Sequence, residues 1–413
     1  MSKSVNEILS ISLLIICFLI VKFITIESLY IGGHDSFQYI EWARVLGTQE
    51  QNLQFFRPLL YLILKISHFV SDWDPRTFKV LLISIGCFNL LLYFYLTLKI
   101  TNELSLAIIV TALLIINENF MVADVTGEIT QIEFFFCSIF FCSIVFHKKW
   151  KSNFSFLIVV ICALPLPIIH EEKVLLALIT FYLAFEFKTF LKLSSSVMVS
   201  LGLLYLYLNQ KNVEDFIEIT YLVGRAWNSP FYLINNPIET LNDMLLVTDP
   251  VTSATVLVTL YLSLTKTVNF TQRLQLVQSK SDQTLFYSCI FYIILIGVLF
   301  RGVELSRTIG VVVPFMAIYT YRYILNFISP KFLSLAVVLS ICHNLLIMGL
   351  VRDIDPKKSG IYYEQASIAL SMDENKCKTL LNDESYYEPR TAMWGSDPNY
   401  GLKSKVYFYH CYQ

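Results

Sequence analysis

Long apolar runs separated by short polar interruptions make up most of the chain. A helix needs roughly 20 apolar residues to cross the hydrocarbon core of a bilayer. Several of the runs fall short of ~17 residues, a length that suits tilted helices or helices buried inside a bundle. The pattern predicts an all-α polytopic membrane helical bundle with about 11 transmembrane helices, approximately over residues 8–26, 77–98, 104–117, 128–146, 154–169, 173–187, 194–208, 251–265, 284–300, 308–327 and 332–350.

Positively charged residues gather in every second connection between these runs. Cytoplasmic connections of membrane proteins retain Lys and Arg, so we place this set inside: Lys3, Lys99, Lys148, Lys149, Lys151, Lys188, Lys192, Lys266, Arg273, Lys280, Arg322 and Lys331. The other connections are longer and rich in Asp and Glu, and we place them outside. We therefore expect a transmembrane domain over residues 1–350, with an uncleaved first span, and a small external C-terminal segment over residues 351–413.

The first external connection is too long for a simple loop and contains two predicted interfacial helices. Residues Ser36–Leu46 form the first, and Pro58–Val70 form the second, which has too few apolar residues to cross the membrane. A proline suits the first turn of a helix, because its missing N–H would have no partner within the helix there. We expect both helices to lie along the outer membrane surface.

Composition agrees with a membrane protein and excludes some functions. Hydrophobic residues make up 55% of the chain and charged residues only 15%, whereas about a quarter of an ordinary globular chain is charged. The formal net charge of -1 leaves no basic excess for a phosphate backbone, so we expect no nucleic-acid partner. Seven of the nine cysteines lie in apolar runs, as small buried hydrophobes do. Cys377 and Cys411 lie in the external segment and could form a disulfide.

The first external connection also carries the most specific motif in the chain. It reads Gly-Gly-His-Asp-Ser-Phe-Gln-Tyr over residues 32–39, continues with Trp-Ala-Arg over residues 42–44, and ends in Phe-Arg-Pro over residues 56–58. This arrangement resembles the first external loop of GT-C glycosyltransferases, in particular the aminoarabinose transferases and protein O-mannosyltransferases. Asp35, Tyr39, Ala43 and Arg57-Pro58 match, although the aminoarabinose type usually has Lys where this chain has Arg57 and a second Pro where it has Leu59. The resemblance implies a multispan enzyme that takes a sugar from a polyprenyl-phosphate donor.

Asp35 is the predicted catalytic residue. A sugar on a lipid phosphate already has a good leaving group, so an inverting enzyme needs one carboxylate to take the proton from the acceptor hydroxyl. Asp35 follows two glycines, which let a ligand approach the backbone closely. The alternative is that Asp35 only caps the helix that starts at Ser36.

The leaving phosphate requires fixed cations on the same outer side. Charges so close to hydrocarbon are costly and mark functional sites by default. The alternative for each is a snorkelling anchor or an internal ion pair, such as Lys173 with Glu172 or Arg301 with Glu304. The candidates for donor-phosphate binding are Arg57, His170, Lys173, Arg301 and Arg307.

Three acids are candidates for binding the acceptor or supporting the cations. Asp124 and Glu128 belong to the segment that opens the fourth span, and Glu171 lies beside His170. Asp124 could equally be a helix cap, with Glu128 favoured by the helix dipole. No HxxxH, HExxH or DxD spacing supports a metal site, and we expect no metal and no cofactor.

Three functions are compatible with this sequence. The leading hypothesis is an inverting glycosyltransferase at the outer face of a bacterial cytoplasmic membrane, acting on a glycan, lipid or protein acceptor. A polysaccharide polymerase or ligase of the cell envelope would depend on arginines in a large external loop, and residues 209–250 contain only Lys211 and Arg225. A lipid or glycan transporter would place charges at mid-membrane and often repeats its halves. Here the charges gather at one face.

Overall fold

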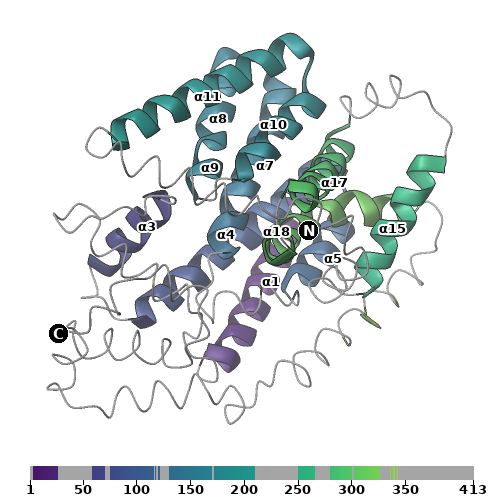
Figure 1. The fold of residues 1–413 in the computed structure, drawn as a ribbon. Helices are drawn as coiled ribbons and strands as arrows, with labels where there is room; N and C mark the ends of the chain where they lie inside the picture. The colour runs from purple at the N-terminus through teal and green to yellow at the C-terminus, as the bar shows by residue number, and fades with distance from the viewer. Residues whose placement is uncertain are drawn as a thin grey trace, which may run out of the picture.

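The computed structural model describes residues 3–26, 58–69, 75–115, 117, 120, 130–169, 172–209, 250–265, 280–299, 302–325, 335, 338, 339 and 342. All elements in these ranges are α-helices, and they pack into one bundle (Figure 1). The predicted all-α polytopic bundle is therefore confirmed.

Ten of the eleven predicted spans coincide with described helices. These helices are α1 (Lys3–Ile26), α4 (Pro75–Thr101), α5 (Leu104–Ile115), α7 (Thr130–Trp150), α8 (Asn153–Ala163) with α9 (Pro165–Ile169), α10 (Lys173–Ala184), α11 (Phe187–Asn209), α15 (Pro250–Thr265), α17 (Ser281–Leu299) and α18 (Gly302–Ile324). The second predicted interfacial helix is α3 (Pro58–Phe69), which begins at its proline as expected. The helix predicted over Ser36–Leu46, most of the span over 332–350 and the segment 351–413 lie outside the described residues.

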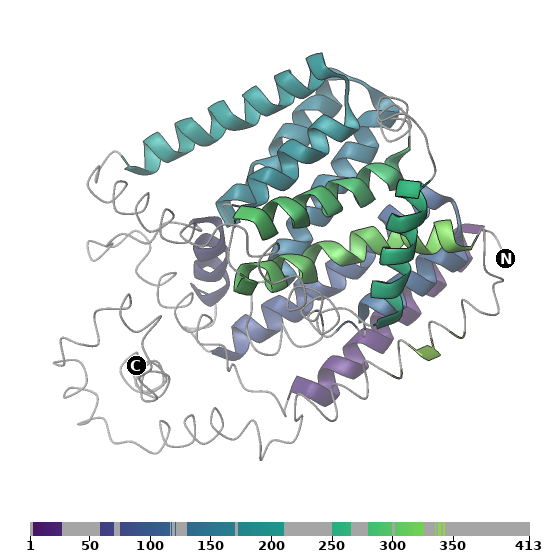
Figure 2. The same ribbon diagram turned by 45° about the vertical axis from the view of Figure 1, so that its right-hand side comes forward.

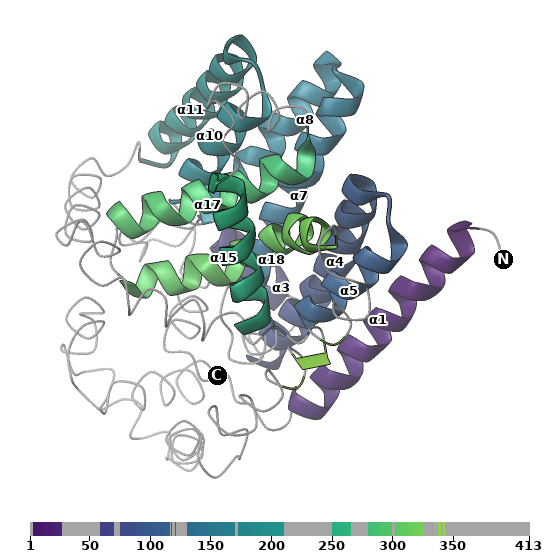
Figure 3. The same cartoon turned by 90° about the vertical axis from the view of Figure 1, so that its right-hand side faces the viewer.

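Three described helices are long and apolar enough to cross a membrane, over Ser4–Lys22, Val80–Thr101 and Thr130–Trp150. The shorter apolar helices cover Leu104–Ile115, Asn153–Ile169, Lys173–Ala184 and Ser281–Ile296. Only 11% of the α1 window is buried, and α1 lies at the edge of the bundle (Figure 3). Most of its exposed side chains are large and apolar, among them Ile8, Leu13 and Ile20. Such a surface suits contact with lipid chains.

Two tight turns build helical hairpins in the part of the chain described. Asn102 separates α4 from α5 with a φ of 59°, and Lys151 separates α7 from α8 with a φ of 46°. A left-handed residue after the last helical turn lets the backbone reverse while its N–H still bonds to the helix. The N–H of Asn102 donates to the carbonyl of Leu98 at 2.8 Å. Helices α4 and α5, like α7 and α8, therefore run in opposite directions, as alternating spans require.

Helix α18 lies at the centre of the described bundle and packs against α5, α7, α15 and α17. Helix α4 packs against α1, α3, α5 and α7, while α10 packs against α17, α9 and α11. Figure 2 shows α11 along one edge and α1 along the opposite edge, with α17 and α18 between them. Aromatic rings fill the centre: the ring of Phe315 lies 4.8 Å from that of Phe134 and 4.7 Å from that of Phe141.

The structure differs from the prediction by several residues at a number of helix boundaries, and two of them affect the argument about the site or have a plain local cause. The span predicted over 154–169 is divided at Leu164, because Pro165 has no N–H to continue the helical ladder. Helix α18 begins at Gly302, earlier than the predicted residue 308, so Arg307 lies within its first two turns. Hydropathy marks where a helix becomes apolar, whereas backbone hydrogen bonding continues through its polar first turns.

Candidate functional site

The sequence placed the candidate site at the outer ends of the helices, and the structure describes part of it. Lys173 is described fully, and Arg307 is placed by the backbone of α18, where it shares a face with Glu304 at i, i+3 spacing. The other candidates lie outside the described residues and stay predictions: Asp35, Arg57, Asp124, Glu128, His170, Glu171 and Arg301, as does the pairing of Cys377 with Cys411.

Lys173 opens α10 and is buried, with 1% of the residue exposed. Its Nζ lies 3.2 Å from Glu172 Oε1 and 3.5 Å from Glu133 Oε2. The ion pair with Glu172, which the sequence left open as the alternative to a phosphate contact, is present. Glu133 projects from the first turn of α7, so Lys173 joins α7 to α10.

Tyr292 of α17 completes this buried cluster. Its hydroxyl donates to Glu172 Oε1 at 3.1 Å, and its ring centroid lies 5.4 Å from Lys173 Nζ. We call Glu133, Glu172, Lys173 and Tyr292 the outer cluster, after the side on which the charge pattern predicts it to lie. A buried charge is tolerated only when partners compensate its lost hydration, and here both carboxylates form an ion pair with the lysine. The cluster therefore fixes the start of α10 against α7 and α17.

Two members of the outer cluster, Glu133 and Tyr292, are not among the predicted site residues, and the sequence carries a signal for one of them. Glu133 is an ionisable residue in an otherwise apolar span, and such residues mark functional or paired sites. Tyr292 is one of 24 tyrosines, and nothing in its neighbourhood along the chain distinguishes it. Its role depends on how α17 packs against α10.

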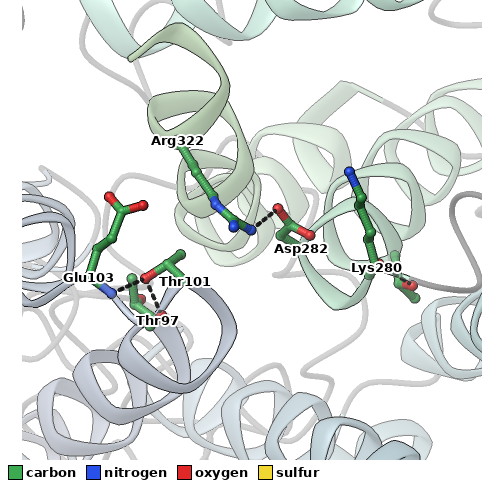
Figure 4. Close-up of polar contacts among 7 residues, drawn as sticks. Thr97, Thr101, Glu103, Lys280, Asp282 and Arg322 are labelled. Carbon is green, nitrogen blue, oxygen red and sulfur yellow. Dashed lines mark hydrogen bonds and ion pairs between the residues drawn. The ribbon is translucent and has the colours of Figure 1, made fainter. Parts of the chain in front are cut away.

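A second polar cluster lies at the opposite end of α7. Lys148, in the last turn of α7, donates to Thr284 Oγ1 at 3.0 Å, and Arg322 of α18 pairs with Asp282 of α17 at 2.8 Å. Figure 4 shows Arg322 extended toward Asp282, with Glu103 on its other side. Lys148 lies about 22 Å along the helix from Glu133, at 1.5 Å per residue.

We call Lys148, Asp282, Thr284 and Arg322 the inner cluster, after the side on which the charge pattern predicts it to lie. Lys148, Lys280 and Arg322 come from three connections that are far apart in the sequence, all placed inside by their charge. Contacts with α17 bring all three to one end of the bundle: Thr284 accepts from Lys148 and itself donates to the carbonyl of Lys280 at 3.0 Å. The outer cluster lies at the other end, as alternating spans require.

Within the described part of the chain, no group of three or more His, Cys, Asp or Glu side chains could hold a metal ion. Within the described ranges, no cysteine forms a disulfide with another described cysteine. Cys137 and Cys289 are buried as predicted, whereas Cys17 and Cys342 are exposed.

Comparisons with known proteins find a match in fold only. No family model and no curated protein sequence matches the chain. A crystal structure of ArnT from Cupriavidus metallidurans bound to undecaprenyl phosphate matches with a TM-score of 0.55 and 13% sequence identity. The match covers 97% of this chain and 75% of that chain. The chain therefore has the fold of ArnT, a GT-C aminoarabinose transferase, as the resemblance of its first external connection predicted.

Proposed function

We propose that the protein is an integral membrane glycosyltransferase of the GT-C type. It transfers a sugar from a polyprenyl-phosphate donor to an external glycan, lipid or protein acceptor. The observation that carries this proposal is the fold, shared over nearly the whole chain with a protein whose structure holds undecaprenyl phosphate. The motif around Asp35 and Arg57 supports it independently, because the two residues match the GT-C pattern at the expected place after the first span.

In the proposed reaction, Asp35 takes the proton of the acceptor hydroxyl as the oxygen attacks the anomeric carbon. The bond from that carbon to the phosphate oxygen breaks, and the lipid phosphate leaves with its electron pair. Attack from the face opposite the phosphate inverts the anomeric carbon. A phosphate needs no protonation to leave, so one carboxylate is sufficient.

Cations around the leaving phosphate stabilise its charge. Arg57, Arg301, Arg307 and His170 are the proposed donors, and the planar fork of Arg suits two phosphate oxygens at once. Lys173 differs from them because it is buried and already contacts two carboxylates. Its geometry favours a positioning role, in which it holds the start of α10 directly after the segment that carries His170 and Glu171.

The remaining acids complete the proposed site. Asp124, Glu128 and Glu171 bind the acceptor or orient the cations, and the reaction takes place at the outer face of a bacterial cytoplasmic membrane without metal or cofactor. The fold also favours a transferase over a polymerase, ligase or transporter, because the matched structure is that of a transferase.

The test is a transfer assay with the full chain in lipid nanodiscs and a set of polyprenyl-phosphate sugars. Release of polyprenyl phosphate that depends on an acceptor distinguishes transfer from transport, which moves the lipid unchanged. We expect Asp35→Asn to lower the rate about 10²–10⁴-fold, because that is the usual loss when a general base is removed.

A matched control and a contradicting result follow from the alternative role of Asp35. Glu103→Gln changes an exposed carboxylate near the inner cluster, and we expect it to keep full activity. Asn is as good a helix cap as Asp, so an Asp35→Asn variant with more than about a third of the wild-type rate would assign Asp35 to capping.

A further inference from the structure

A second buried lysine lies at the outer end of the bundle, outside the predicted site. Lys22 is 1% exposed although it belongs to α1, the peripheral helix. Its Nζ donates to the main-chain carbonyl of Phe120 at 3.1 Å and lies 5.1 Å from the ring centroid of Phe18. A buried ammonium group is costly unless it is compensated, and a span that otherwise faces lipid gains nothing from it as an anchor.

Phe120, the residue that Lys22 contacts, is held at both its carbonyl and its N–H. The carbonyl of Phe120 also accepts from Gln131 Nε2 at 2.9 Å, and the N–H of Phe120 donates to Asn117 Oδ1 at 3.3 Å. Asn89 of α4 in turn donates to Gln131 Oε1 at 2.8 Å. Three side chains from α1, α7 and the connection itself therefore fix one residue between α5 and α7.

The ring of Phe120 is fixed as well. Its centroid lies 6.0 Å from that of Phe18 and 5.5 Å from that of Phe134, in tilted and edge-on arrangements that aromatic pairs favour. The connection between α5 and α7 thus contains an anchored point at Phe120. Asp124 follows that point by four residues, and Glu128 precedes Gln131 by three.

Helix α1 links this anchored point to the connection that carries Asp35. Lys22 lies one turn before the end of α1, and the connection with Asp35 follows that end. The first turn of α7 links this arrangement to the outer cluster, because Gln131 belongs to the one and Glu133 to the other. The stems of the segments that carry Asp35, Asp124 and Glu171 are therefore joined through buried polar contacts.

We propose that Lys22 is a positioning residue that tethers the connection over residues 116–129 to the exit of α1. It thereby sets the distance between the proposed base and the acids proposed to bind the acceptor. The positioning claim rests on the proposed function, whereas the tether itself does not. A small displacement of groups that hold an acceptor can cost about 10²-fold in rate.

The experiment compares Lys22→Met with Lys22→Arg in the full chain in nanodiscs. Met has a similar length but no charge and no donor, whereas Arg keeps both. For Lys22→Met we expect amide hydrogen exchange over residues 116–129 to speed up several-fold. We also expect kcat to fall roughly ten- to hundredfold, with the donor KM within about twofold. Lys22→Arg should keep most of the wild-type protection from exchange and most of the wild-type kcat.

Gln131→Met provides a second variant at the same carbonyl should Lys22→Met fold poorly, with the same expected direction. The control is Lys99→Met, because Lys99 also lies over an aromatic ring, 4.9 Å from Tyr95, but at the inner end and exposed. It should change neither exchange over 116–129 nor kcat.

The two readouts separate the possible failures. Unchanged exchange in both Lys22→Met and Gln131→Met overturns the tether. Faster exchange with an unchanged kcat overturns the positioning role. A wild-type chain that transfers no sugar defeats the proposed function and the positioning role together, while the exchange measurement still decides the tether.

Discussion

Lys173 shows how a single buried charge depends on its neighbours. It contacts Glu133 and Glu172 inside the bundle, and all three side chains are nearly excluded from solvent. Removing one member of such a cluster leaves the others uncompensated, at a cost of about 3–5 kcal/mol. We therefore expect Lys173→Met to lower the melting temperature clearly in a thermal assay of the purified protein. The exposed Lys192→Met should leave it unchanged.

The charge interpretation also predicts a rescue. The triple variant Lys173→Met, Glu133→Met, Glu172→Met has no buried charge left in the cluster, and replacing a whole buried ion-pair network by apolar residues of similar volume is often neutral. Its melting temperature should recover toward the wild-type value. If the triple variant is less stable than Lys173→Met alone, packing and not charge balance accounts for the loss.

At the scale of elements, the contact between α1 and α4 depends on a glycine. A Cβ atom added at Gly86 would lie 2.6 Å from Phe18 Cζ and 3.2 Å from Phe18 Cε1. Phe18 is fully buried and packs against Phe120, so its ring has little room to move. We expect Gly86→Ala to destabilise the protein by about 1–3 kcal/mol, the usual cost of overpacking. Thermal unfolding would show it as a lower melting temperature.

Gly202 in α11 is the matched control. A Cβ atom there meets nothing within 4 Å, so Gly202→Ala should be neutral or stabilise by up to about 1 kcal/mol through helix propensity. Adding Phe18→Leu to Gly86→Ala should restore part of the loss. Equal effects of the two Gly→Ala changes would show that α1 does not pack closely on α4.

At the scale of the whole molecule, every proposed role depends on orientation. The inner cluster brings together residues from separate connections, and the charge pattern predicts that these connections lie in the cytoplasm. We introduce single cysteines at Lys280 and Ser396 in a background without the native thiols. An impermeant maleimide on intact cells should label the cysteine at Ser396 and not that at Lys280.

Ser152, in the connection between α7 and α8, is less suitable as the inner labelling site. It caps α8 in a capping box with Ser155, and its loss would weaken that helix. Equal or reversed labelling would mean that the orientation or the number of spans is wrong. Asp35 would then lose its place on the outer side, and a donor presented there could not reach it.

The sequence alone determined the class of the fold and the approximate extent of ten described helices. Hydrophobic runs are read locally, because each helix must satisfy its own backbone inside a bilayer. Pro58 and Pro165 mark helix boundaries for an equally local reason. The motif around Asp35 is local as well, and by itself indicates the GT-C fold.

Only the tertiary structure decided which polar side chains meet. Lys173 was a candidate phosphate ligand by position, and its burial between Glu133 and Glu172 appears only when α7 packs beside α10. Lys22 carried no sequence signal beyond a charge near the end of a span, yet it bonds to Phe120, which is 98 positions away in the sequence. Such pairings depend on which helix faces are in contact, and a local hydrophobic pattern carries no information about the partner face.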